Sequence, residues 1–339
     1  MKKSIVVAQA GYGYWGPNLL RVFHELEDCR VKWLCELKPG RLEAARRRHA
    51  SLGTTEDFEE ILRDPEVDAV VVATEIVSHF RLVRAALEAG KHVFVEKPLA
   101  HSSAEASALT RLAEKRRLTL GVGHVFLYHP AVRALKAEFA PARLGPLCYV
   151  DMIRVNPGPP QPKHDVIWDM APHDVALALF LARARPTAVR ATGRRYLNAK
   201  LDEAASIEID FPKGVLARIH VSWMSSRRVR RVEAYGRRGS AFYDDVEPFE
   251  KLRLVSAGED TRVGAGARDT KALYYAAGDI RIPALPPEEP LKTECRDFLD
   301  AIRARRQPLS GPAMGLEVVR VLEAAARSAA AKGRTLRLK

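Results

Sequence analysis

Short apolar segments alternate with amphipathic helical segments throughout the first third of the chain. The clearest apolar segment, residues 69–73, reads Ala-Val-Val-Val-Ala and lies between Asp68 and Thr74. Continuous apolar strands of this kind are typical of parallel sheets that are covered on both faces. Because helices separate the strands, the pattern predicts βαβ crossovers and a doubly wound α/β sheet. The expected strands are residues 5–10, 31–36, 69–73, 92–95 and 119–122, and the expected helices are 17–26, 42–49, 57–62, 79–89 and 104–117.

The pattern changes after about residue 122. Longer strand-like segments follow one another, with turn signals such as Pro212-Lys213-Gly214 between them, and one strong helix over 172–181 interrupts them. Runs of strands with segregated helices predict an α+β domain on a large, mostly antiparallel sheet. We therefore expect two domains, over residues 1–122 and 123–339, with C-terminal helices that are able to pack back on the first. Residues 256–271, rich in Gly, Ala and charge, predict a loop.

Composition excludes several classes of protein. The chain carries a formal net charge of +13, but acidic residues alternate with Arg in most helical segments, which is typical of a solvated surface rather than a nucleic-acid partner. No apolar run approaches the ~18 residues that a membrane span needs. The N-terminus lacks a cleavage site, and the four Cys lie far apart. These features predict a reduced, cytoplasmic protein with no membrane partner, no disulfide framework and no metal site.

A glycine-rich segment, residues 11–16 (GYGYWG), follows the first strand directly and opens the first helix. In this context Gly11 permits a tight turn, Gly13 lets the backbone approach a pyrophosphate, and Gly16 allows close packing of the helix. The helix N-terminus then offers N–H groups and a positive dipole end to phosphates. The alternative is a glycine-rich turn without a ligand, which the flanking strand and helix disfavour. The segment predicts dinucleotide binding.

Glu36 ends the second expected strand, 20 residues after Gly16. A carboxylate in this position accepts hydrogen bonds from ribose hydroxyls and repels a 2′-phosphate, which favours NAD. Lys38 favours NADP instead, since a nearby cation would attract the 2′-phosphate. An ordinary polar strand end is the alternative interpretation of Glu36. NAD is the expected cofactor, and NADP stays open.

Glu96-Lys97-Pro98 follows the expected strand 92–95. Strand C-termini of such sheets face the ligand crevice, so Lys97 should point at the nicotinamide end. Its ammonium would stabilise the alkoxide that develops as hydride leaves a hydroxyl-bearing carbon. Without the other motifs, a lysine and a proline after a strand are more often a surface turn.

Asp169 and His173 are spaced i, i+4, so on a helix they share one face. An imidazole takes or gives the proton of a secondary alcohol, and a nearby carboxylate holds substrate or orients the ring. The alternative is a helix start at which Asp169 is the N-cap, Pro172 lies in the first turn and His173 is a surface residue.

Other polar side chains are weaker candidates. His79 begins a helix at a strand end and would touch cofactor, while His124, Tyr128 and His129 lie in a crossover and would line a substrate pocket. Each is equally well explained as a packed or capping residue. Arg154 and the basic run 227–231 would meet a substrate pyrophosphate, although solvated positions explain them as well.

Together, residues 11–16, Glu96-Lys97-Pro98 and the Asp169/His173 pair resemble the Gfo/Idh/MocA oxidoreductase family over essentially the whole chain. Within it the chain resembles a branch found with polysaccharide and nucleotide-sugar pathways. Some members of that branch are 3-dehydrogenases of UDP-N-acetylglucosamine or its uronic acid. The segments that carry this closer resemblance are Gly11–Asn18, Gly123–Pro130, Val166–Asp174 and Tyr243–Asp245.

The resemblance implies a Rossmann domain and a second domain whose open-faced sheet serves a homo-oligomer, a dimer or a tetramer. It implies bound NAD(H) or NADP(H) and hydride transfer at a ring carbon, with Lys97 and His173 as the catalytic pair, Asp169 on the substrate and Glu96 on the nicotinamide ribose. The expected cofactor-binding residues are Gly11, Gly13, Tyr14, Trp15, Gly16, Glu36, Thr74, His79, Glu96 and Lys97, and the expected substrate-binding residues are His124, Tyr128, Arg154, Trp168 and Asp169.

The sequence departs from the family pattern in three places. The first strand ends in Gln9-Ala10, where an apolar pair is usual, and residues 73–79 lack the usual proline and Ser-Thr pair. His129 stands where this branch often has Asn. The first two departures bear on contacts to the adenosine half of the cofactor, and the third bears on substrate preference.

The sequence thus predicts an NAD-dependent dehydrogenase of a sugar, with a nucleotide sugar as the favoured substrate. His173 would take the hydroxyl proton as hydride leaves, and Lys97 would stabilise the alkoxide. One alternative is an inositol or free-sugar dehydrogenase or reductase on the same scaffold. Another is a non-catalytic NAD(H)-binding sensor, against which the complete set of Lys97, Asp169 and His173 argues.

Overall fold

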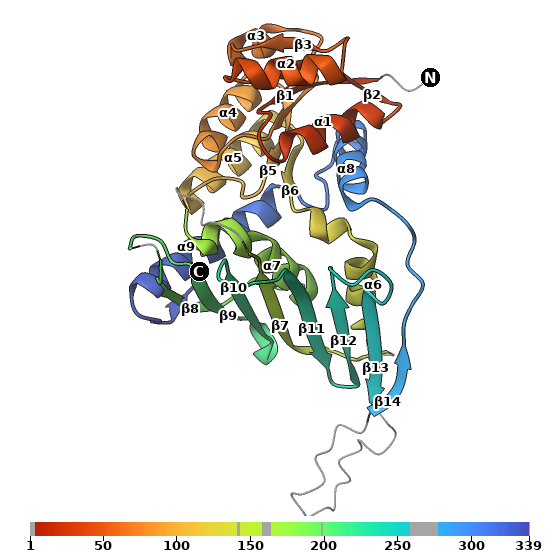
Figure 1. Ribbon diagram of the computed structural model, residues 1–339, viewed down its shortest axis with the longest axis vertical. Coiled ribbons are helices and arrows are strands. Elements are labelled where there is room, and N and C mark those ends of the chain that lie inside the picture. The colour runs from red at the N-terminus through yellow and green to blue at the C-terminus, as the bar shows by residue number, and fades with distance from the viewer. Residues whose placement is uncertain (1–3, 141–142, 158–163, 198, 258–276, 339) are drawn as a thin grey trace, which may run out of the picture. The chain divides into compact units, whose positions relative to one another are not determined.

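The computed structural model describes residues 4–338 apart from 141–142, 158–163, 198 and 258–276. The chain divides into two compact units, which are described separately (Figure 1). The N-terminal unit comprises Met1–Tyr128 and Glu288–Glu323, and the C-terminal unit comprises His129–Pro287 and Ala324–Lys339. The boundary expected after residue 122 differs from this division, because the N-terminal unit continues to Tyr128 and also includes residues 288–323.

The N-terminal unit is built on a six-stranded parallel sheet with the order β3-β2-β1-β4-β5-β6. This order reverses direction at β1, so the prediction of a doubly wound α/β sheet is confirmed. The three-residue strand β3 was not expected, because so short a segment has no recognisable period. The strands are β1 (Ile5–Ala10), β2 (Cys29–Cys35), β3 (Gly53–Thr55), β4 (Ala69–Val72), β5 (His92–Glu96) and β6 (Leu120–Gly123). The helices are α1 (Gly16–Glu25), α2 (Pro39–Arg48), α3 (Phe58–Arg63), α4 (Ile76–Glu88), α5 (Ser103–Arg116), the 3-10 turn η1 (Val125–Tyr128) and α8 (Pro290–Ala304).

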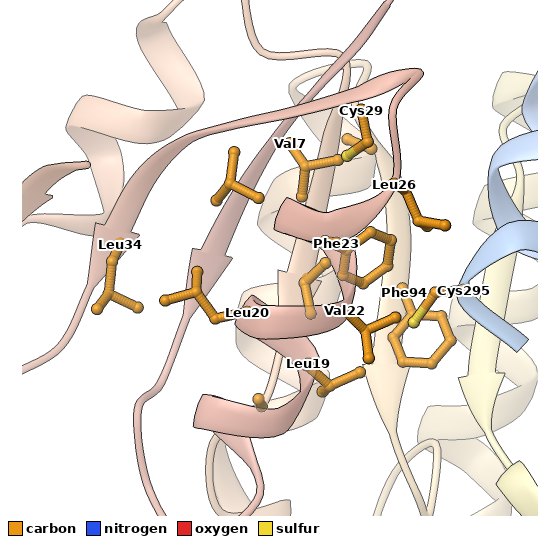
Figure 2. Close-up of a cluster of buried hydrophobic side chains, with 14 of the residues drawn as sticks. Val7, Leu19, Leu20, Val22, Phe23, Leu26, Cys29, Leu34, Phe94 and Cys295 are labelled. Atoms are coloured by element: carbon orange, nitrogen blue, oxygen red, sulfur yellow. The ribbon is translucent and has the colours of Figure 1, made fainter. Parts of the chain in front are cut away.

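A buried aromatic cluster joins α8 to this sheet. The rings of Phe23 (α1), Phe94 (β5) and Phe298 (α8) meet edge to face. The centroid distances are 6.0 Å between Phe23 and Phe94, 6.4 Å between Phe23 and Phe298, and 5.6 Å between Phe94 and Phe298. Figure 2 shows Phe23 and Phe94 beside Cys295, the residue of α8 that extends the same cluster. Helices α1 and α8 pack together on one side of the sheet and α4 and α5 on the other (Figure 1). These contacts explain why a segment so late in the sequence belongs to the N-terminal unit.

The C-terminal unit is built on a nine-stranded sheet with the order β14-β13-β12-β11-β7-β10-β9-β8-β15. Among the described strands of this sheet only β7 and β10 pair in parallel, so the prediction of a mostly antiparallel sheet is confirmed. Its strands are β7 (Leu147–Val155), β8 (Ala188–Arg194), β9 (Ala204–Asp210), β10 (Leu216–Ser222), β11 (Val229–Gly236), β12 (Gly239–Asp244), β13 (Leu252–Ala257), β14 (Ala277–Arg281) and β15 (Leu336–Arg337). Its other elements are α6 (Pro130–Glu138), α7 (Val166–Ala182) and the 3-10 turn η2 (Pro212–Gly214), while α9 (Pro312–Ala330) belongs partly to each unit.

Helix α7 covers one face of this sheet, where it contacts β7, β9 and β10. The strands accordingly alternate buried residues with more exposed ones, as the two-residue period of a half-covered strand requires. The expected loop over 256–271 begins inside β13, and its residues 258–271 lie outside the described part of the chain.

The helix expected over 172–181 begins six residues earlier, at Val166, so the interpretation of Asp169 as its N-cap is wrong. The cap is Asp165, whose carboxylate oxygen Oδ1 accepts hydrogen bonds from the backbone N–H groups of Ile167 and Trp168. Pro172 lies inside the helix rather than in its first turn. The earlier start places Asp169 and His173 on the same regular helix, one turn apart.

Among the helices that the structure describes, none combines the length and the apolar character that crossing a membrane requires.

The aromatic cluster leads to a test of how the N-terminal unit is held together. We expect Phe298→Ala to lower its free energy of unfolding by about 3–5 kcal/mol, because the substitution leaves a cavity among fully buried rings. Urea titration followed by tryptophan fluorescence measures the loss. Phe249, 88% exposed in the C-terminal unit, is the matched control, and Phe249→Ala should change stability by less than about 0.5 kcal/mol. Equal effects of the two substitutions would contradict the role of the cluster.

Candidate active site

The glycine-rich loop between β1 and α1 has the geometry of a phosphate-binding turn. Gly11 has φ +96°, and a Cβ there would lie 2.5 Å from the carbonyl oxygen of Ala73. A Cβ on Gly16 would lie 2.6 Å from the carbonyl oxygen of Gly11, so both positions exclude a side chain. At Gly13, by contrast, the nearest described atom would be a guanidinium nitrogen of Arg41, 3.8 Å away. The backbone at Gly13 is therefore open to an approaching ligand.

The side chain of Gln9 joins the two ends of this loop. Its side chain is 1% exposed, and its amide Nε2 donates hydrogen bonds to the carbonyl oxygens of Gly11 (2.8 Å) and Gly16 (2.9 Å). The sequence showed Gln9 only as a departure from an apolar pattern. A polar residue at the end of an otherwise apolar strand could have indicated this role, since buried polar side chains are normally hydrogen-bonded, often to the backbone.

Glu36 lies directly after β2 and binds the same loop. One of its carboxylate oxygens accepts the backbone N–H of Tyr12 at 2.8 Å, and the other accepts that of Lys38 at 3.0 Å. Arg41 adds a guanidinium contact at 3.3 Å. Burial raises the pKa of Glu36, but these donors outweigh burial and the pKa is lowered, so the carboxylate is ionised at neutral pH. The sequence named Lys38 as the nearby cation, whereas the structure places Arg41 beside the carboxylate.

The residues of this unit fit a dinucleotide. Helix α1 begins at Gly16 without a capping side chain or an acidic residue in its first turn, within the part of the chain that the structure describes. Its N–H groups are thus available to an anion next to the open backbone of Gly13. Tyr14 and Trp15, the two aromatic residues of the loop, are 95% and 37% exposed.

The residues after β4 are tied to the loop that follows β5. The ring of His79 is buried on α4, and its Nδ1 lies 2.9 Å from the carbonyl oxygen of Pro98 while its Nε2 lies 3.2 Å from that of Thr74. The hydroxyl of Thr74 in turn bonds that of Ser78 at 2.7 Å. The placement of His79 fixes two loops at the same edge of the sheet, and a direct contact of His79 or Thr74 with cofactor stays a prediction.

Glu96 is the last residue of β5, and Lys97 follows it, joined to Pro98 by a cis peptide bond. Burial raises the pKa of Glu96 to about 7, although the neighbouring Lys97 charge and N–H and a hydrogen bond from the Trp15 side chain lower it. Trp15 therefore connects the glycine-rich loop to the end of β5. The Lys97 cation and N–H and the Trp15 donor thus surround one carboxylate at the sheet edge where both loops meet.

His124 and Tyr128 follow β6 in the same unit. The Tyr128 hydroxyl donates to a carboxylate oxygen of Asp297 at 2.8 Å and accepts the backbone N–H of Ser310 at 3.1 Å. These bonds join η1 to the residues around α8, which is a structural role. His124 is fully buried. A substrate contact of either residue stays a prediction.

In the C-terminal unit, the first turns of α7 carry the remaining candidates. Most of the helix is buried, but Trp168, Asp169 and His173 keep partial exposure, and the i, i+4 spacing of Asp169 and His173 places these two on one face. The indole N–H of Trp223 donates to a carboxylate oxygen of Asp169 at 3.0 Å, which fixes that side chain. Helix α7 thus presents a carboxylate and an imidazole together.

Arg154 of β7 forms a buried bidentate ion pair with Asp174, at 2.6 and 3.1 Å. Arg–carboxylate pairs of this geometry are strong and directional. Because Asp174 follows His173 directly, the pair anchors the segment of α7 that carries the imidazole. The expected contact of Arg154 with a substrate phosphate stays a prediction, and Arg230 and Arg231 pair with Asp245 and Asp244 on the same sheet.

His129 acts as the N-cap of α6, where its Nδ1 accepts the backbone N–H of Ala131 at 3.1 Å. Its ring also packs on Tyr243, with centroids 5.4 Å apart. The Tyr243 hydroxyl donates to Asp245. Within the described residues, no group of three or more His, Cys, Asp or Glu side chains is arranged to hold a metal ion.

Comparison with known proteins agrees with this arrangement. A family model described as an oxidoreductase family with an NAD-binding Rossmann fold matches residues 5–124, and a model of the GFO/IDH/MocA C-terminal domain matches residues 132–242. A UDP-N-acetylglucosamine 3-dehydrogenase from Acidithiobacillus ferrooxidans is 32% identical over 243 residues, which are 71% of this chain and 72% of that protein.

An inositol 2-dehydrogenase from Acidothermus cellulolyticus is 33% identical over 291 residues, or 83% of each protein. A solved structure of UDP-N-acetylglucosamine 3-dehydrogenase GnnA from Acidithiobacillus ferrooxidans has the same fold, with a TM-score of 0.82 and 24% identity over 96% of this chain and 98% of that one. Similarity extends through both units. The chain therefore belongs to the Gfo/Idh/MocA family, and it is an oxidoreductase with an NAD-binding Rossmann domain.

Proposed function

We propose that the protein is an NAD-dependent dehydrogenase that oxidises a secondary hydroxyl of a nucleotide sugar of the UDP-N-acetylglucosamine type. The observation that carries the proposal is the joint presence of Lys97 at the end of β5 and of Asp169 and His173 on one partly exposed face of α7. The similarity to a UDP-N-acetylglucosamine 3-dehydrogenase over about 70% of the chain supports the substrate class. A binding-only sensor would not need all three of these side chains.

The N-terminal unit would hold the cofactor. The backbone at Gly13 and the start of α1 would receive the pyrophosphate, Glu36 the adenosine ribose, and Glu96 the nicotinamide ribose. When bound, the nicotinamide ring accepts hydride from the substrate carbon or returns it. The buried Gln9 amide would keep the loop in its binding form, because it joins both ends of the turn.

The chemistry of the substrate hydroxyl would be divided between two side chains. His173 takes the hydroxyl proton as the C–H bond breaks, and the Lys97 ammonium stabilises the alkoxide that develops. Asp169, held by the Trp223 indole, accepts a hydrogen bond from substrate. The Arg154–Asp174 pair maintains the position of His173 along α7.

The preference for NAD over NADP would come from Glu36. Its carboxylate is ionised, with one oxygen bonded to Tyr12 of the glycine-rich loop and the other to the N–H of Lys38, so a 2′-phosphate on a ribose bound there would meet a negative charge. Arg41 is already paired with this carboxylate, which reduces its attraction for a phosphate.

We also infer that the protein forms a homo-oligomer through the face of the C-terminal sheet that α7 leaves uncovered. On that face Tyr149 and Tyr235 stack with centroids 4.8 Å apart, and Ile153 is 39% exposed. Light scattering coupled to gel filtration should give the mass of a dimer or tetramer, and Ile153→Arg should reduce it. Leu197→Arg, at a residue 78% exposed elsewhere in that unit, should leave the mass unchanged. A monomeric mass for the unsubstituted protein would refute the inference.

The substrate class is tested directly by following reduction of NAD at the absorbance band of the reduced nicotinamide. The panel is UDP-N-acetylglucosamine, its uronic acid, other UDP- and dTDP-sugars, myo-inositol and glucose. We expect turnover only with a nucleotide sugar. Turnover only with free polyols would replace the proposal by the inositol or free-sugar alternative, which the Acidothermus cellulolyticus relative represents. No reduction of NAD with any compound would reject both the nucleotide-sugar proposal and the free-sugar alternative.

The role of Lys97 is tested by Lys97→Ala. We expect kcat to fall by at least about 100-fold, the lower range for loss of a group that stabilises a developing charge, while NADH still binds. NADH binding is measured by fluorescence titration. Lys115→Ala, at an exposed lysine on α5, should leave kcat unchanged. Turnover that survives Lys97→Ala would remove Lys97 from the mechanism.

Cofactor selectivity is tested by Glu36→Gln, which keeps an acceptor for the Tyr12 N–H and removes the charge. The ratio of kcat/KM with NADP to that with NAD should rise by at least about tenfold, since charged hydrogen bonds to the ribose are lost and the repulsion of a phosphate disappears. Glu43→Gln, at an exposed glutamate on α2, is the control. An unchanged ratio would show that selectivity lies elsewhere.

A further inference from the structure

Two buried polar side chains near the end of β6 take no part in the proposed chemistry. Glu294 of α8 and His124 are each 1% exposed. Among the described residues, no side chain forms a hydrogen bond with either carboxyl oxygen of Glu294 or with either ring nitrogen of His124. The backbone N–H of His124 faces the Glu294 carboxyl group and lowers its pKa. Because buried polar atoms are almost always bonded, both side chains call for a function or a partner.

These side chains lie next to the candidate nicotinamide end of the site. Glu96 pairs with Gly123 in the β5–β6 register, and a Cβ on Gly123 would lie 3.0 Å from the Glu96 carboxyl group. His124 follows Gly123 directly. The charge of Glu96 acts on Glu294, and that of Lys97 acts on His124. The four side chains therefore form one electrostatic group within the N-terminal unit.

The other charged groups around Glu294 are already satisfied. Asp297, one turn along α8, accepts hydrogen bonds from Tyr128, from Arg306 and from the backbone N–H of Leu309. Its negative charge disfavours a second negative charge on Glu294. The contact of α8 with α1 adds exposed ion pairs at the start of the helix, between Arg21 and Glu289 and between Lys292 and Glu25.

Burial, together with the charges of Glu96 and Asp297, raises the pKa of Glu294 well above its ordinary value. Burial and the Lys97 charge lower the pKa of His124 to about 3. The raised pKa favours the protonated form of Glu294, a carboxylic acid with one O–H donor, and the lowered pKa keeps His124 a neutral imidazole with one donor and one acceptor. Glu96, with a pKa of about 7, is the group whose ionised form benefits from an added donor.

We propose that Glu294 is a positioning residue that acts through Glu96. As a carboxylic acid it donates its O–H toward the Glu96 carboxylate through a water held with His124, and so keeps that carboxylate ionised and oriented beside Lys97. The role of Glu96 at the nicotinamide ribose belongs to the proposed function, on which this inference rests. The proton on Glu294 stays in place and takes no part in the oxidation.

The first test asks whether Glu294 holds a proton, and it needs neither substrate nor turnover. Infrared difference spectra in H2O and D2O, recorded above the Glu96 pKa of about 7 so that Glu96 is ionised, should show a protonated-carboxyl C=O band that disappears in Glu294→Gln. Asp300→Asn, which alters an exposed carboxylate on the same helix, should leave the band in place. A band that persists in Glu294→Gln would overturn the proposal.

The second test follows NADH binding against pH by fluorescence. In the unsubstituted protein the affinity should change with a midpoint near the pKa of Glu96, about 7. Glu294→Gln is neutral and keeps a donor, so the midpoint should not move. Glu294→Leu removes the donor, which disfavours the ionised form of Glu96 and should raise the midpoint by about one pH unit.

Each other outcome of the second test decides against the proposal. A midpoint that stays in place in Glu294→Leu, with only a lower melting temperature, would show a merely structural role. A midpoint that shifts in Glu294→Gln would show that Glu294 is ionised. Since NADH binding requires no substrate, failure of every sugar in the panel would leave these measurements valid, and a normal panel with an unshifted Glu294→Leu midpoint would reject this inference alone.

Discussion

The parallel pairing of β1 with β2 and β4 is the constraint on which the candidate cofactor site depends. Parallel strands end at the same edge, so the loops after them meet there. The backbone N–H of Gly11 donates to the carbonyl oxygen of Cys35, and that of Ala73 donates to the carbonyl oxygen of Ala10. These bonds join the ends of three strands. That register explains why Gly11 lies so close to Ala73 and where Glu36 lies. It also explains why the Gln9 amide reaches the carbonyl oxygens of Gly11 and Gly16.

The return of α8 to the N-terminal unit adds a second layer behind this edge. The edge-to-face contacts of Phe298 with Phe23 and Phe94 fix the helix against the sheet. The same helix then carries Glu294 toward the end of β5. A packing interaction and a polar one are therefore coupled, since the helix that the rings hold in place also carries the buried Glu294, whose pKa burial raises.

In the C-terminal unit, helix α7 is mostly buried and yet leaves the polar side chains of Asp169 and His173 partly exposed. The Asp165 cap starts α7 early enough for Asp169 and His173 to lie one turn apart on it. The Arg154–Asp174 pair then ties the helix to β7. A buried ion pair contributes little net stability but is strongly destabilising when one partner is removed, so it serves better as a fixed register than as a source of stability.

The sequence by itself determined what local periodicity and local spacing encode. The strand–helix alternation, the turn at residues 11–16, the lysine after β5 and the Asp169/His173 spacing depend on neighbours within a few residues, and they predicted the doubly wound sheet and most of the candidate site. The tertiary structure decided what depends on distant partners: the role of Gln9, the pairing of Arg41 with Glu36, the parallel β7–β10 pair, the return of α8 and the burial of Glu294. Burial and long-range pairing arise only when distant segments pack, and no local pattern records them.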